Sequence, residues 1–110
     1  MEPLELLQTL CTAHGVSGAE DSAAAAAKEL LLPYAQEVWT DDYHNVYARI
    51  REAKPGEPTL LLEAHLDEIG LTVTHITEEG FLKVAACGGI DRRLLLAQEV
   101  LVLGEKPLCG

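Results

Sequence analysis

Thr59-Leu-Leu-Leu-Glu-Ala-His-Leu-Asp-Glu-Ile-Gly70 is the stretch of this 110-residue chain from which the fold is best approached. Residues 59–64 are mostly apolar, which is typical of central strands in α/β sheets that are buried on both faces. Three polar residues, His65, Asp67 and Glu68, follow directly. Ligands and chemistry gather at the carboxyl ends of strands in open α/β sheets, so this point is the first candidate for a functional site.

His65 and Asp67 are two residues apart in an extended segment, so we expect their side chains to project to the same side. A metal-bound imidazole usually donates its other N–H to a carboxylate, which fixes the tautomer and raises basicity. The pair therefore fits two hypotheses: a metal ligand with its orienting carboxylate, or a surface histidine paired with Asp67 or Glu68. These three residues alone favour neither.

Length and charge exclude several classes of protein. A chain of 110 residues forms one domain at most, and 48% hydrophobic residues indicate a folded protein rather than a disordered one. Acidic residues outnumber basic ones 18 to 8, for a formal charge of −10. That charge repels phosphate backbones and anionic membrane surfaces, so we expect neither nucleic acid nor a membrane as a partner.

The cysteines and the apolar runs indicate where the protein works. Cys11, Cys87 and Cys109 are odd in number and lack Cys-x-x-Cys spacing, so we expect small buried hydrophobic residues in a reducing compartment. The sequence shows no signal-peptide pattern, and its apolar runs are shorter than the ~18 residues of a membrane span. These observations predict a cytoplasmic protein.

The order of elements predicts the fold class. The sequence favours helices at residues 3–13 and, after a Ser17–Glu20 capping box, to about residue 32, where Pro33 ends the helix. Predicted strands follow at residues 36–41, 46–51, 59–64, 71–76, 81–86 and 99–103, and a helical turn is predicted at residues 91–96. We expect an α/β protein, α+β in appearance as it stands: two N-terminal helices and a mostly hairpin-connected sheet of five or six strands. His14, His44 and His75 are interpreted as structural or surface residues.

Several motifs resemble one family of enzymes. Ala64-His-Leu-Asp-Glu-Ile-Gly70 is similar to the His-Met-Asp-Glu-Ile-Gly segment of metallopeptidase family forty-two, cytoplasmic co-catalytic aminopeptidases that include glutamyl, deblocking and tetrahedral aminopeptidases. Asp42-x-x-Asn-Val46 resembles a family hairpin, with His44 where glycine is usual, a substitution that can alter the turn. Further collinear matches are Gly15-Val-Ser-Gly-x-Glu20, Gly88-Gly-Ile-Asp-Arg92, Leu95 and Gln98-x-Val100.

The resemblance implies a function residue by residue. His65 would match a histidine ligand of one of two divalent metal ions, zinc or cobalt, and Asp67 the carboxylate that orients it. Residues 1–76 resemble the start of the family's catalytic domain, and residues 77–110 resemble the entry into an inserted dimerisation domain. The family's substrates are peptides, from which it removes N-terminal residues, and its members form homo-oligomers.

The 110 residues contain no counterparts of the family's other metal ligands or of its catalytic glutamate. A catalytic zinc normally needs three protein ligands, so we expect the chain to resemble the N-terminal third or so of an aminopeptidase, inactive by itself. The alternative is a non-catalytic truncated paralogue that acts as an oligomerisation or interaction module, since an interrupted sheet leaves an edge open to another strand. A third possibility is an acidic α+β domain in which His65 is only structural.

Overall fold

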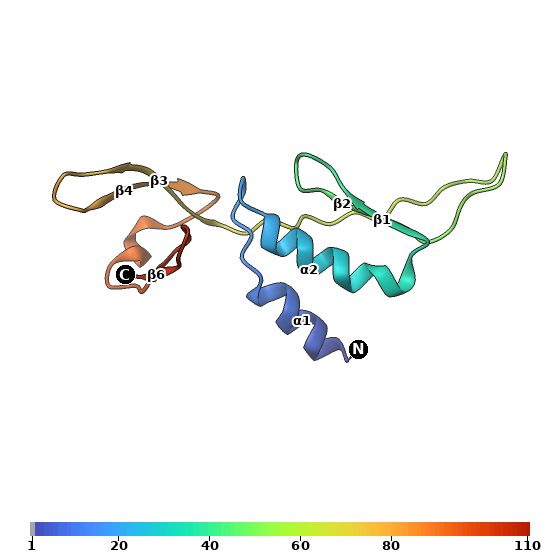
Figure 1. The fold of residues 1–110 in the computed structure, drawn as a ribbon, viewed down its shortest axis with the longest axis horizontal. Helices are drawn as coiled ribbons and strands as arrows, with labels where there is room; N and C mark the ends of the chain where they lie inside the picture. The colour runs from blue at the N-terminus through green and yellow to red at the C-terminus, as the bar shows by residue number, and fades with distance from the viewer. Residues whose placement is uncertain (1) are drawn as a thin grey trace.

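The computed structural model describes residues 2–110, whose regular elements are short and mostly local. The helical elements are α1 (Pro3–Thr12), α2 (Asp21–Leu31) and the 3-10 turns η1 (Leu32–Tyr34) and η2 (Arg92–Leu95). The strands are β1 (Glu37–Thr40), β2 (Val46–Arg49), β3 (Gly70–Ile76), β4 (Leu82–Cys87), β5 (Leu101–Val102) and β6 (Leu108–Cys109). The molecule measures 62 × 28 × 27 Å, with α1, α2, β1 and β2 toward one end and β3, β4 and β6 toward the other (Figure 1).

The two helices confirm the prediction, but the second begins differently. In α1, Pro3 occupies the first turn, and the Glu2 N–H donates to the Glu5 carboxylate at 3.2 Å. The α2 helix starts at Asp21 with Glu20 as its N-cap, so the capping-box interpretation of Ser17 is wrong. Its alanine run lets the backbone pack closely, and Ala23 and Ala24 are the buried apolar residues within the described chain.

Both predicted hairpins are confirmed. β1 pairs antiparallel with β2, and the rings of Trp39 and Tyr47, opposite each other, stack with centroids 5.1 Å apart. β3 pairs antiparallel with β4 around the turn at residues 77–80, with an irregularity between Val73 and His75. The β1–β2 hairpin packs against α2, which places the hairpin tip beside the first turn of that helix.

The prediction of one sheet containing a buried central strand is wrong. Over residues 2–110 the strands form three separate two-stranded sheets, β1–β2, β3–β4 and β5–β6, and β6 was not predicted. Residues 59–64 are extended but belong to no ladder, and the exposed fractions of Leu60, Leu61 and Leu62 are 83%, 76% and 84%. An apolar sequence becomes a central strand only where neighbouring strands supply hydrogen bonds on both sides, and the described residues supply none there.

The expectation that the cysteines are buried is also wrong. Cys11 and Cys109 are exposed and Cys87 is half-buried, because so little of this elongated chain is enclosed. All three are free thiols. None of the helices within residues 2–110 is long and apolar enough to cross a membrane.

Candidate functional site

Two segments about fifty residues apart are joined where the candidate site lies. The Glu68 N–H donates to the Gly15 carbonyl at 2.7 Å, and the Gly15 N–H donates back to Glu68 Oε1 at 3.1 Å. Val16 and Glu68 form an isolated parallel β-bridge between these bonds. We call residues 15–17 together with residues 67–70 the clamp. It fixes the chain immediately after His65, although the preceding residues 59–64 are unpaired.

Glycines allow the two sides of the clamp to approach closely. A Cβ on Gly70 would lie 2.9 Å from Val16 Cγ1 and nearer still to Cγ2. A Cβ on Gly15 would lie 2.7 Å from the Cβ of buried Ala23. Since real Cβ atoms do not approach other heavy atoms so closely, both positions require glycine for the present packing. The glycine of each motif therefore has a packing role.

His65 is oriented by two acceptors on the same residue. Its Nδ1 lies 3.0 Å from the Asp67 carbonyl oxygen and 3.2 Å from Asp67 Oδ1. A carbonyl can only accept, so Nδ1 carries the proton in this geometry, and Nε2 is the unprotonated nitrogen of the neutral ring. The predicted same-side arrangement of His65 and Asp67 is confirmed. The His65 side chain is 86% exposed, so Nε2 is accessible from solvent.

Asp67 uses its second oxygen on the other side of the clamp. The Ser17 hydroxyl donates a hydrogen bond to Asp67 Oδ2, while Oδ1 faces His65. The hydroxyl of Ser17, and then the hydrogen bond with His65, lower the pKa of Asp67 below its ordinary value. Ser17 is the site residue that the sequence interpretation missed, because its position before an alanine-rich segment resembled a helix cap. The available signal was that Ser17 and Asp67 both lie in motifs that carry the family resemblance.

His44 forms a second polar cluster beside the site. Its Nδ1 lies 3.2 Å from Glu20 Oε2, and its Nε2 lies 3.3 Å from Asp21 Oδ1. These carboxylates, Glu20 first, raise the pKa of His44, whereas the Gly18 N–H and then His44 lower the pKa of Glu20. With a φ of +62°, His44 keeps the left-handed turn expected of glycine. It ties the hairpin to α2 rather than being an isolated surface residue.

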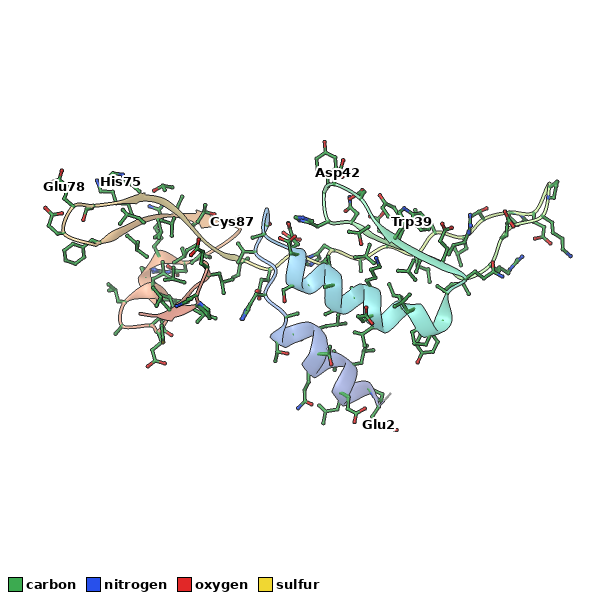
Figure 2. All side chains as sticks on the ribbon, viewed as in Figure 1. Glu2, Trp39, Asp42, His75, Glu78 and Cys87 are labelled. Carbon is green, nitrogen blue, oxygen red and sulfur yellow. The ribbon has the colours of Figure 1, made fainter. Side chains whose placement is uncertain are left out.

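A groove of about 1050 Å³ lies along these features. Its lining includes β2, the extended residues 58–67, and Glu20 and His44. Side chains project into open space along most of the elongated chain (Figure 2). His75, in β3, lies with Glu78 toward the far end of the β3–β4 hairpin in that view, in agreement with its interpretation as a structural or surface residue.

The described residues do not by themselves fit a complete metal centre. Among residues 2–110, no group of three or more histidine, cysteine, aspartate or glutamate side chains is arranged to hold an ion. Glu68, the nearest further carboxylate in the sequence, accepts the Gly15 N–H within the clamp. His65 Nε2 is thus one candidate ligand atom, which falls short of the three protein ligands of a catalytic zinc.

Comparison with known proteins finds relatives of the chain in a family of peptidases. The family model described as M42 glutamyl aminopeptidase matches residues 44–110. The chain is 35% identical over 103 residues to the lysyl aminopeptidase of Pyrococcus furiosus, covering 93% of this chain and 29% of that protein. It is 35% identical over 103 residues to the putative aminopeptidase FrvX of Escherichia coli, covering 94% and 28%.

Two solved structures resemble the chain as folded. One is the TET aminopeptidase from a marine sediment archaeon of the Thaumarchaeota, with a TM-score of 0.79, 37% identity, and coverage of 89% of this chain and 27% of that chain. The other is aminopeptidase APDkam598 from the archaeon Desulfurococcus kamchatkensis, with a TM-score of 0.82, 35% identity, and coverage of 96% and 29%.

The matched proteins define a class, the aminopeptidase hydrolases. Within that class, the chain belongs to the M42 glutamyl aminopeptidase family. It spans somewhat under a third of the length of the relatives that it matches.

Proposed function

We propose that these residues form one wall of the metal site of an M42-type aminopeptidase, which removes N-terminal residues from peptides. In this proposal His65 Nε2 is a ligand to one of two divalent ions, zinc or cobalt, and Asp67 orients the imidazole. The observation that carries it is that Nδ1 lies within hydrogen-bond distance of two oxygens of Asp67, which leaves Nε2 for a metal. The free edge of the ring is also strongly exposed.

By itself the 110-residue chain is not expected to hydrolyse peptides, because no three histidine, cysteine, aspartate or glutamate side chains among its described residues are arranged to hold a metal ion. We expect weak zinc binding in calorimetry that is lost in His65→Ala and kept in His75→Ala, a change at the far end of the β3–β4 hairpin. Aminoacyl-nitroanilides should remain uncleaved with added zinc or cobalt.

Two results would contradict these expectations. Zinc binding that is unchanged in His65→Ala would remove the ligand assignment. Metal-dependent cleavage that disappears in His65→Ala would show that the chain builds a complete catalytic site and would refute the expected inactivity.

We propose a division of the chain on the basis of the family resemblance. Residues 1–76 would belong to the start of the catalytic domain, and residues 77–110 would lead into an inserted dimerisation domain. The proposed boundary falls in the turn that links β3 to β4, a tight connection at residues 77–80. Limited proteolysis should therefore cleave elsewhere, because the hairpin hydrogen bonds hold both sides of this turn together.

A second candidate function is an interaction module, favoured by residues 59–64. This segment presents three exposed leucines and an unpaired backbone along the groove beside β2. Homo-oligomerisation through this segment predicts a mass in light scattering that rises with protein concentration and is reduced by Leu61→Asp. Leu94→Asp, at a leucine of η2 that is 70% exposed, is the matched control. A monomer at all concentrations would argue strongly against this function.

A further inference from the structure

We propose that Ser17 is a positioning residue that supports the Nδ1–H tautomer and the orientation of His65 through the Asp67 carboxylate, in addition to the Asp67 carbonyl oxygen that Nδ1 also faces. This proposal deepens the proposed function, since it matters for metal binding only if His65 is a ligand. It concerns a residue that does not touch His65 itself. Both oxygens of the Asp67 carboxylate have a partner: Oδ2 accepts from the Ser17 hydroxyl, and Oδ1 faces Nδ1 of His65.

The carboxylate of Asp67 needs a second partner in order to orient the ring. The last torsion of an aspartate is broad and roughly two-fold, so a single hydrogen bond leaves the carboxylate free to rotate. The Asp67 side chain is 42% exposed, and water can compete for an oxygen that is not otherwise occupied. The Ser17 hydroxyl occupies Oδ2 and thereby keeps Oδ1 directed at Nδ1 of His65.

The backbone of Ser17 is fixed independently of its hydroxyl. On one side of it, the Gly15–Glu68 hydrogen bonds hold the clamp. On the other side, Gly18 has a φ of +89° and donates its N–H to Glu20 Oε1 at 2.7 Å. The thiol of Cys87 also lies 3.8 Å from the Ser17 carbonyl oxygen. Removal of the hydroxyl should therefore leave the loop in place.

A capping role does not explain the Ser17 hydroxyl. The α2 helix begins at Asp21 and has Glu20 as its N-cap, three residues beyond Ser17. Instead, the hydroxyl reaches across the clamp to a residue fifty positions further along the chain. That contact joins the two motifs through a side chain adjacent to the candidate ligand, which a purely local turn would not require.

The test is the tautomer of His65 in the 110-residue chain, read from the ring ¹⁵N shifts at a pH where histidine is neutral. We expect wild-type His65 to be mainly protonated at Nδ1. In Ser17→Ala the ratio of the Nδ1–H to the Nε2–H form should fall by about 2- to 12-fold, the range that corresponds to loss of one net hydrogen bond. Ser17→Thr, which keeps a hydroxyl, should restore the ratio.

Ser22→Ala is the matched control, because it removes an exposed hydroxyl in the first turn of α2 without touching Asp67. The amide resonance of Glu68 reports whether the clamp persists in each variant. The proposal is overturned by an unchanged ratio in Ser17→Ala, by an equal change in Ser22→Ala, by failure of threonine to restore it, or by a wild-type ring without the Nδ1–H preference.

Zinc titration separates this proposal from the proposed function. Second partners of ligating histidines typically contribute 10- to 100-fold in metal affinity, and Ser17 acts one step further away, so we expect about a 2- to 10-fold loss in Ser17→Ala. Zinc affinity that is unchanged in His65→Ala refutes the ligand assignment, but it does not affect the conclusion from the tautomer ratio. Zinc binding that requires His65 beside an unchanged tautomer in Ser17→Ala refutes the positioning role alone.

Discussion

The clamp and residues 59–64 are adjacent in the chain and opposite in character. Residues 59–64 have an apolar, strand-like sequence and yet make no ladder, with leucines 76–84% exposed. The clamp is polar and rich in glycine, and yet backbone and side-chain hydrogen bonds join it across fifty residues. Strand propensity is realised only where a partner strand is present, whereas the clamp carries both partners within this chain.

The largest effect on this contrast is expected from a change at Gly70 in the clamp. Gly70→Ala places a Cβ against the branched side chain of Val16, so we expect the clamp to be destabilised by about 1–3 kcal/mol, as in overpacked interiors. Faster amide hydrogen exchange at Glu68, whose N–H bonds the Gly15 carbonyl, is the direct measurement. The double variant Val16→Ala/Gly70→Ala should recover part of the protection.

Gly89→Ala is the control for that prediction. A Cβ at Gly89 meets no heavy atom within 4 Å, so exchange at Glu68 should be unchanged. If Gly70→Ala were as harmless as Gly89→Ala, the close approach of the two motifs would be refuted, and the clamp would be no better ordered than residues 59–64.

An intermediate effect is expected at the His44 tie, which holds the β1–β2 hairpin beside the groove. The pKa of His44 is raised in the folded chain, so the tie is fully formed below the ordinary pKa of about 6.5 and weakens as the pH rises through the folded value. The lowered pKa of Glu20 weakens the tie only on the acid side, as the pH falls through that lowered value. An NMR titration of His44 should give a midpoint above 6.5 that moves down in Glu20→Gln. An unchanged midpoint in that variant would contradict the pairing.

The smallest effect is expected at Leu62. Because its side chain is 84% exposed, Leu62→Ala should change the free energy of unfolding by no more than about 0.5 kcal/mol in urea titrations. A leucine of a buried central strand would cost about 2–5 kcal/mol. A loss in that larger range would restore the buried strand that the sequence predicts and remove the contrast with the clamp.

Local patterns explain which parts of the fold were predictable. The helices follow from apolar spacing and the alanine run, and the first hairpin follows from Asp and Asn chemistry at its turn. There the Asp41 carboxylate accepts from the Tyr43 and Asn45 N–H groups and from the Tyr47 hydroxyl. The His65–Asp67 contact was equally local, because two residues of separation in extended chain suffice.

The parts that escaped prediction depend on distant partners. The hydroxyl of Ser17 finds Asp67 only after the chain folds back, and no periodicity near Ser17 encodes that contact. Similarly, burial of residues 59–64 requires strands on both sides, which an apolar run does not guarantee. The cysteines were assigned to a core for the same reason, since composition alone does not say how much interior an elongated chain encloses.

The exposed leucines at positions 60–62 also affect how readily the protein aggregates when salt is added. An extended, uncharged apolar run with free backbone groups is a template for cross-β stacking between molecules. Glu63 follows the run directly, and the formal charge of −10 keeps molecules apart. Both protections are electrostatic and are screened over about 10 Å at 0.1 M salt. Added salt should therefore promote fibril formation in this chain, and dilute buffer should keep it dispersed.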